Sequence, residues 1–321
     1  MKCRLIDENV FKGTIKNKRT PIKVNLITNY NCNLNCIYCD AGRMQNKQLP
    51  TEELTKLIVT LKHLGTKQIN FIGGEPLVRR DIADILKFSK DNGIKVVLHS
   101  NCTLLTEKST NIINNLDCVF TCINGPEAIN DQMRGESVYK HTVEAINILK
   151  NNGIDVVVDM ILTNLNSDKE CISHLLGLAK QMEFKVNFQP VFDHRLANMD
   201  EEKIEGLNLR LNRDELGTVA RYLLEIYDEK YFFNSREYFE LLLNEGTCTV
   251  DNCYFGHYSI IIDPEGSVSR CYGYLKNQTN TNGFKSGWED AISNLQVSEC
   301  KKCLYNVHIE DNYQIHSYIN S

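Results

Sequence analysis

The feature that most constrains this chain is a series of strand-like and helix-like segments that alternate between residues 22 and 190. Each strand-like run is short and apolar. The predicted strands span residues 22–27, 68–72, 95–99, 118–123, 154–161 and 185–189. Strand–helix units in series predict a parallel sheet with right-handed crossovers. The periodicity fits a partial six-unit barrel, a full eight-unit barrel and an open doubly wound sheet equally well.

Amphipathic segments between and after these strands predict helices. The expected helices span residues 52–64, 81–93, 107–116, 138–152, 169–182, 213–227 and 235–243. Thr51 is the predicted N-cap of the first helix, and Asp81 caps the second. Residues 258–270 read as a β-hairpin around Asp263-Pro264-Glu265-Gly266.

After the last strand–helix unit, the regular alternation of segments stops and cysteines return. We place a domain boundary near residue 234, so that residues 1–234 form the α/β core, with an N-terminal extension over residues 1–20. Residues 235–321 form a small α+β domain that contains the hairpin.

Short polar motifs follow directly after the predicted strands. They are the cysteine loop 31–39, Gly73-Gly74-Glu75-Pro76, Ser100-Asn101 and Asn124-Gly125. Function gathers at the carboxyl ends of the strands in parallel α/β sheets. These motifs therefore predict one functional site at that edge of the sheet.

The cysteine loop holds Cys32, Cys36 and Cys39 in a C-x3-C-x2-C arrangement. Iron–sulfur clusters normally take four thiolates, so three thiolates leave one iron open for chemistry. The alternative is a structural zinc ion, which needs a distant fourth ligand.

The triplet and the motifs downstream of it resemble the radical S-adenosylmethionine (SAM) superfamily. The resemblance covers most of the chain after residue 20 and implies a partial (β/α)6 TIM-like barrel. It implies a 4Fe–4S cluster on Cys32, Cys36 and Cys39 whose open iron is chelated by SAM. It further implies reductive cleavage of SAM to a 5′-deoxyadenosyl radical, and an external one-electron reductant of the flavodoxin or ferredoxin type.

The resemblance also implies which residues hold SAM. Glu75 matches the family's GGEP carboxylate that binds the SAM amino group, and Arg134 matches an arginine that pairs with the SAM carboxylate. Cys122 and Asn124 stand where the family usually has Ser and Asp. The predicted SAM-binding residues are Tyr38, Gly73, Gly74, Glu75, Ser100, Asn101, Cys122, Asn124 and Arg134.

Four further cysteines form a second pattern near the C-terminus. Cys253 and Cys271 are separated by 17 residues, and Cys300-x2-Cys303 follows. Two such pairs indicate a metal site, for which a zinc ribbon is the plain alternative. The order resembles the Twitch domain, a shortened SPASM domain, which implies one auxiliary 4Fe–4S cluster on these four cysteines.

Cys248 and Tyr272 are the candidate catalytic residues beside this second site. Cys248 is a spare thiol that could donate a hydrogen atom to a substrate radical or act as an alternative ligand; an inert thiol is the plain alternative. Tyr272 directly follows Cys271. At this position relatives in the family carry an aspartate base or a cysteine hydrogen donor. Tyr272 is neither, so neither mechanism transfers directly.

Polar residues in otherwise apolar strands are candidates for the substrate site. They are His99, Asp159, Asn187 and Gln189. A buried polar group needs a partner, which can be a ligand. The loop Asp193-His194-Arg195 could add charged contacts.

Composition narrows the range of partners and compartments. The formal charge of −5 on 321 residues gives no electrostatic reason to expect nucleic acid or an anionic membrane. No apolar run reaches the roughly 20 residues that span a bilayer, and no secretory signal is visible. The 13 cysteines are clustered, which suits metal ligands in a reducing compartment. We expect a cytoplasmic enzyme.

Three functional hypotheses remain open. The first is a radical SAM oxidoreductase or epimerase that takes a hydrogen from a small polar substrate such as a sugar, aminocyclitol or nucleotide-linked sugar. The second is a radical SAM maturase that epimerises or cross-links a ribosomally made peptide. The third is a non-catalytic zinc-binding protein.

Overall fold

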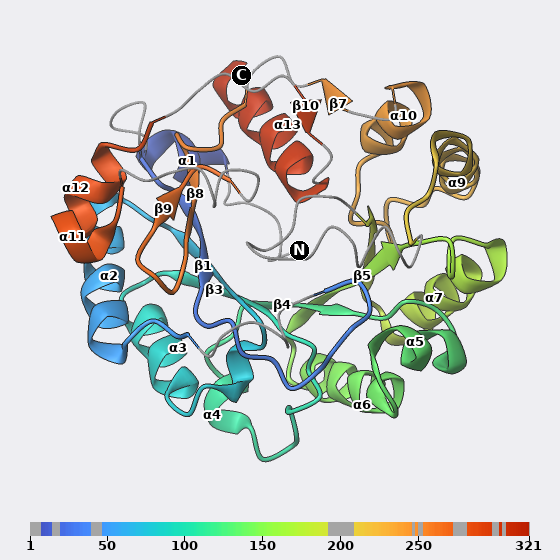
Figure 1. Cartoon of the computed structure of the whole chain (residues 1–321), viewed down its shortest axis with the longest axis horizontal. Helices are drawn as coiled ribbons and strands as arrows, with labels where there is room; N and C mark the ends of the chain where they lie inside the picture. The colour runs from blue at the N-terminus through green and yellow to red at the C-terminus, as the bar shows by residue number, and fades with distance from the viewer. Residues whose placement is uncertain are drawn as a thin grey trace.

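The structure is a computed structural model of the whole chain (Figure 1). It describes residues 8–14, 20–39, 47–191, 209–245, 248–249, 253–271, 281–296, 302–303 and 306–320. The structural statements below refer to these ranges.

A single eight-stranded sheet forms the centre of the fold, in the order β6-β5-β4-β3-β2-β1-β8-β9. Its strands are β1 (Lys23–Ile27), β2 (Gln68–Ile72), β3 (Lys95–His99), β4 (Cys118–Cys122), β5 (Asp155–Leu162), β6 (Lys185–Pro190), β8 (Ser259–Ile262) and β9 (Val268–Ser269). Strands β1 to β6 are parallel, and β8 pairs in parallel with the outer edge of β1. Strand β9 is antiparallel to β8, which confirms the predicted hairpin.

Helices cover the outer side of the sheet and one end of it (Figure 1). Those of the core are α1 (Glu8–Thr14), α2 (Thr51–Leu64), the 3₁₀ turn η2 (Pro76–Val78), α3 (Ile82–Asp91), α4 (Thr110–Ile113), α5 (Glu127–Arg134), α6 (Val138–Asn151), α7 (Lys169–Met182) and α9 (Arg213–Glu225). The later elements are α10 (Arg236–Glu245), α11 (Gly283–Ser286), α12 (Trp288–Ser293), α13 (Asn306–Asn320) and a small pair of strands, β7 (Cys248–Thr249) and β10 (Lys302–Cys303).

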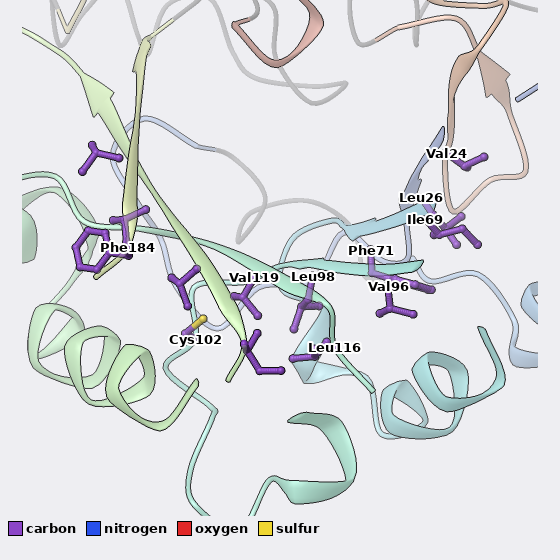
Figure 2. Packing of buried hydrophobic residues seen from close by; sticks show 14 of the residues in the cluster. Val24, Leu26, Ile69, Phe71, Val96, Leu98, Cys102, Leu116, Val119 and Phe184 are labelled. Atoms are coloured by element: carbon purple, nitrogen blue, oxygen red, sulfur yellow. The ribbon is translucent and has the colours of Figure 1, made fainter. Parts of the chain in front are cut away.

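Alternation along the strands gives the sheet an apolar outer face and a mixed inner face. Val24, Leu26, Phe71 and Leu98 lie in the main hydrophobic cluster with the covering helices (Figure 2). Residues of the opposite parity point inward. The inner face carries the polar residues Lys23, Asn25, Gln68, Asn70, His99, Asp159 and Asn187. The fold therefore confirms the expected partial barrel with polar residues on its inner side.

Two local predictions were wrong for identifiable reasons. Thr51 is not the N-cap of α2; Pro50 takes that position, and the Thr51 hydroxyl hydrogen-bonds the carboxylate of Asp81. The helix predicted over residues 107–116 is only the four residues of α4. Ser109 there accepts a hydrogen bond from the Thr106 N–H, a local side-chain contact that competes with helix extension.

No helix in the described ranges is long and apolar enough to cross a membrane.

Candidate active site

The cysteine loop follows β1 and is fastened to two other elements. The Thr28 N–H donates to the Ile72 carbonyl at the end of β2 (2.8 Å), and the Ile37 N–H donates to the Met133 carbonyl of α5 (2.9 Å). Cys32, Cys36 and Cys39 are partly exposed on this loop and form no disulfide. The loop is thus held at the carboxyl edge of the sheet, as the sequence predicted.

Gly73 and Gly74 let the loop after β2 pack directly on the cysteine loop. A Cβ at Gly73 would lie 2.4 Å from the carbonyl oxygen of Asn29, and one at Gly74 would lie 2.1 Å from that of Asn31. The Gly74 N–H donates to the Asn29 carbonyl at 2.9 Å. Glycine is therefore required here by the close approach of two backbones.

Glu75 is fully buried beneath this contact and accepts three hydrogen bonds. Its Oε1 accepts from the Leu77 N–H (2.9 Å) and the Ser100 hydroxyl (2.8 Å), and its Oε2 accepts from the Asn101 N–H (2.6 Å). Burial raises the pKa of Glu75 to about 7, against the opposing effect of these donors. Ser100 and Asn101, predicted to contact SAM, are placed here as partners that orient Glu75.

Arg134 joins a second group of predicted residues. Its guanidinium hydrogen-bonds the Cys122 carbonyl. Burial opposes its charge, but Cys122, Tyr38 and Cys36 outweigh burial and raise the pKa of Arg134. The buried Nε of Arg134 has no hydrogen-bond partner in the described structure. This donor suits the carboxylate of a ligand.

Tyr38 and Asn124 complete this group. The Asn124 Nδ2 donates to the Tyr38 hydroxyl (3.1 Å), which lies 3.5 Å from the Cys122 sulfur. Asn124 Oδ1 accepts from the Ile161 N–H at 2.9 Å. Burial raises the pKa of Tyr38 well above its usual value, so this hydroxyl stays protonated. The site thus links the ends of β4 and β5 to the cysteine loop.

The three loop cysteines have the donor chemistry of an iron–sulfur site. The Leu34 N–H lies 3.4 Å from the Cys32 sulfur, and the Asn101 Nδ2 lies 3.9 Å from it. N–H groups near a cluster sulfur tune such clusters. Burial raises the pKa of the Cys32 thiol to about 11. Within the described ranges, no three His, Cys, Asp or Glu side chains already surround one point, so a cluster would draw the three thiols together.

The second cysteine pattern lies partly outside the described residues. Cys253, Cys271 and Cys303 are partly exposed and form no disulfide. Cys303 in β10 is the register partner of Cys248 in β7, so these two backbone positions are neighbours. Cys300, Tyr272 and the loop Asp193-His194-Arg195 lie outside the described residues, as does the side chain of Cys248.

The four predicted substrate-site residues fall on the inner face of the sheet. The Asn187 Nδ2 donates to Oδ1 of Asp159 at 2.6 Å, and burial raises the pKa of Asp159 to about 7. His99 stacks on Phe120 with the ring centroids 4.5 Å apart. Burial lowers the pKa of His99 to about 3, so its ring is neutral. The Gln189 Nε2 donates to the neighbouring Pro190 carbonyl at 3.0 Å.

Three asparagines that position the site were missed. Asn29 donates to the Asn31 and Glu75 carbonyls (3.0 and 3.1 Å). Asn130 accepts from the Asn124 N–H at 3.0 Å, and Asn166 donates to the Asn124 carbonyl at 3.0 Å. Asn29 and Asn166 follow shortly after β1 and β5, and Asn130 lies within α5. Other Asn residues share such positions, so no sequence signal marks these three.

Comparison with known proteins identifies the family. A sequence model of the radical SAM superfamily matches residues 26–179. An uncharacterized protein of Methanocaldococcus jannaschii is 31% identical over 232 residues, which are 67% of this chain and 78% of that protein.

Two curated relatives match over shorter stretches. The AdoMet-dependent heme synthase of Oleidesulfovibrio alaskensis is 30% identical across 42% of this chain and 37% of its own length. The mycofactocin maturase MftC of Mycolicibacterium smegmatis is 27% identical across 46% of this chain and 40% of its own length. The match therefore spans less than half of either relative.

Two solved structures share the fold. Streptococcus suis SuiB bound to precursor peptide SuiA superposes with a TM-score of 0.65 at 14% identity, over 92% of this chain and 72% of that one. The structure of anSMEcpe with bound AdoMet gives a TM-score of 0.67 at 16% identity, over 94% of this chain and 98% of that one.

The fold and the site define an α/β enzyme whose partial barrel carries a cysteine loop at its carboxyl edge. The chain belongs to the radical SAM superfamily. Enzymes of this family use a 4Fe–4S cluster and SAM. The predictions of family and fold are thereby confirmed, and the zinc-protein hypothesis is set aside.

Proposed function

We propose that this radical SAM enzyme modifies a ribosomally made peptide after abstracting a hydrogen atom from it. Support comes from the names of its relatives, which include a mycofactocin maturase and a PqqA peptide cyclase. The fold is also that of SuiB, which was solved with a precursor peptide. These relatives favour a peptide over the small polar substrate of our first hypothesis.

The proposed chemistry rests on one observation: Glu75, Arg134 and the cysteine loop lie together at one edge of the sheet. In our proposal Cys32, Cys36 and Cys39 hold the cluster. When bound and reduced, the cluster and SAM supply a 5′-deoxyadenosyl radical.

The protein's own residues orient SAM. Glu75 is fixed by three donors and offers a carboxylate to the SAM ammonium group. Arg134, with an unpartnered buried Nε, takes the SAM carboxylate. Tyr38, held by Asn124, would contact the adenine of SAM. Gly73 and Gly74 keep the Glu75 loop in contact with the cysteine loop.

An auxiliary 4Fe–4S cluster on Cys253, Cys271, Cys300 and Cys303 remains a proposal that rests on sequence spacing. Such a cluster would accept or supply an electron for the substrate radical. In the epimerising variant of this proposal, Cys248 would return a hydrogen atom to the substrate radical, and one electron from the auxiliary cluster with one proton would restore its thiol. Tyr272, next to Cys271, is a further candidate to act on the substrate there. The domain boundary near residue 234, the cytoplasmic location and the flavodoxin-type or ferredoxin-type reductant also remain proposals.

Anaerobic purification and reconstitution test the enzyme's cofactor content. Two 4Fe–4S clusters give about eight irons per chain. Under reduction the enzyme should cleave SAM to 5′-deoxyadenosine. A colourless protein that binds zinc and leaves SAM intact would contradict the whole proposal.

A second experiment tests the substrate class. The reconstituted enzyme is incubated with the short peptide encoded nearest its gene, synthesised with deuterated residues. We expect deuterium in 5′-deoxyadenosine and a mass change or altered stereochemistry in the peptide. Transfer of deuterium from deuterated sugar nucleotides, with none from the peptide, would instead support the first hypothesis.

A further inference from the structure

One row of side chains crosses the inner face of the sheet beside the proposed SAM site. Cys122 in β4, Asp159 in β5 and Asn187 in β6 are register partners on three adjacent strands. Register partners project to the same face of a sheet. Val156, Val158, Met160 and Leu162 of β5 belong to the outer core, so Asp159 projects to the inner side.

The carboxylate of Asp159 accepts few hydrogen bonds from the protein. Its Oδ1 accepts one hydrogen bond, from the Asn187 Nδ2 at 2.6 Å. In the part of the chain that is described, Asp159 takes part in no ion pair, and its Oδ2 accepts no hydrogen bond. Glu75, by contrast, accepts three. Asp159 is half-buried and its Oδ2 is not a buried atom, so this oxygen is open to a ligand that adds a second hydrogen bond.

Asp159 lies next to the proposed SAM site without belonging to its hydrogen-bond network. Its register partner Cys122 gives its carbonyl to Arg134. Ile161, two residues further on the same face, donates its N–H to Asn124, which holds Tyr38. Arg134 is close enough to lower the pKa of Asp159 but not to pair with it. In our proposal Arg134 pairs with the SAM carboxylate, which leaves Asp159 without a cationic partner.

The geometry points to Asp159, held by Asn187, as a substrate-binding residue that takes an ammonium or guanidinium group of the peptide. This inference rests on the proposed function only for the identity of the substrate. A Lys or Arg side chain, or an N-terminal amine, would complete the shell of Asp159 with a charge-assisted hydrogen bond. The neighbouring C–H bonds of that residue would then face the site where SAM is bound.

Binding of small peptides tests the inference without turnover. The probes are N-acetylated tripeptide amides with a central lysine, arginine or norleucine, titrated against the reconstituted, SAM-loaded enzyme by isothermal calorimetry. The lysine and arginine peptides should bind about tenfold tighter than the uncharged norleucine peptide, since one charge-assisted hydrogen bond contributes about 1.4 kcal/mol. Asp159→Asn should abolish that difference and leave the affinity for SAM within about twofold, because no SAM contact is lost.

Asp155→Asn is the matched control, because Asp155 lies on the same face of β5, four residues earlier and at the amino end of the strand. This variant should keep the preference for the charged peptides. The inference is overturned if wild-type enzyme shows no such preference, or if Asp159→Asn keeps it. A loss of SAM affinity in Asp159→Asn would assign the residue to the cofactor and also overturn it. Failure of the proposed function is seen separately, as the absence of deuterium transfer from the labelled peptide.

Discussion

At the scale of single residues, two carboxyl groups of this site differ in the number of hydrogen bonds that the protein donates to them. Glu75 is enclosed by donors from η2 and the end of β3, whereas Asp159 has only Asn187. Burial raises the pKa of both groups to about 7. Both groups therefore change their charge near neutral pH. For Asp159 this has a measurable effect on stability.

Asp159→Asn should make the stability of the cluster-free protein less sensitive to a rise in pH from 5 to 8. The folded-state pKa of Asp159 is raised from 3.8 to about 7, so folding favours the protonated form and stability is lost as pH rises toward 7. Asparagine does not titrate. Allowing for partial solvent access, the variant should gain roughly 1–2 kcal/mol over wild type between pH 5 and pH 8.

Denaturant unfolding at both pH values measures this difference. Because Glu75 titrates in both proteins, its contribution cancels in the comparison. A constant gap between the two proteins from pH 5 to pH 8 would show that Asp159 is solvated and ionises normally.

At the scale of elements, the site depends on contact between two loops more than on any single side chain. Asn29, just before the cysteine loop, and Asn31 within it present carbonyl oxygens directly to Gly73 and Gly74. Two backbone hydrogen bonds, Gly74 N–H to Asn29 (2.9 Å) and Glu75 N–H to Asn31 (2.6 Å), join the loops. The positions of Glu75 and of the cysteines are therefore coupled.

Gly74→Ala should destabilise the protein and reduce cluster incorporation. The added Cβ would lie 2.1 Å from the Asn31 carbonyl oxygen, and backbone cannot yield as a flexible side chain does. We expect a loss of about 2–3 kcal/mol in unfolding free energy and less iron per chain at the loop.

Gly177→Ala is the matched control, because Gly177 lies inside α7 and an added Cβ meets nothing within 4 Å. That change should stabilise the protein by roughly 0.5–1 kcal/mol. Denaturant unfolding and iron analysis of both variants check the pair. If both variants had the same unfolding free energy and iron content, close contact between the two loops would not be needed for folding or for cluster incorporation.

The sequence predicts elements well where a local pattern determines them. All six parallel strands lie within a residue of their predicted ends, and α7 spans the predicted residues 169–182. Helix α5 was not predicted, because Glu127–Arg134 has few apolar residues and is stabilised by its contact with the cysteine loop. The motifs predicted which residues lie together at this edge of the sheet. The bonds between them were not predictable, since Ser100 and Asn101 turn toward Glu75 only in the folded sheet.

At the scale of the whole molecule, the C-terminal part completes the sheet that the N-terminal part begins. Strand β8 pairs with β1 over four residues, from Lys23 with Ser259 to Leu26 with Ile262. Lys23 also forms an ion pair with Asp311 of α13 at 2.6 Å, and both side chains are less than 10% exposed. The first strand is thus held by segments more than 230 residues away.

Removing one partner of this buried pair should destabilise the protein strongly. Burial raises the pKa of Asp311 even though Lys23 opposes the shift, so the pair does not fully offset its desolvation. We expect Asp311→Ala to cost about 3–5 kcal/mol because it leaves Lys23 buried and unpaired. The double variant Lys23→Met with Asp311→Ala should lose much less, and the single variant Lys23→Met completes the cycle. A thermal or denaturant double-mutant cycle gives the coupling; additive losses would refute it.

A fragment of residues 1–246 should not fold into a stable domain, although the sequence suggests a boundary near residue 234. The fragment keeps every strand from β1 to β6 but lacks β8, which covers the edge of β1, and α13, which supplies the partner of Lys23. An uncovered β1 edge would expose unpaired backbone groups and favour aggregation. Calorimetry of the fragment and of the full chain measures this. We expect aggregation or no cooperative transition in the fragment. A cooperative transition near that of the full chain would instead show that the barrel is independent of the C-terminal domain and that β8 only packs on its edge.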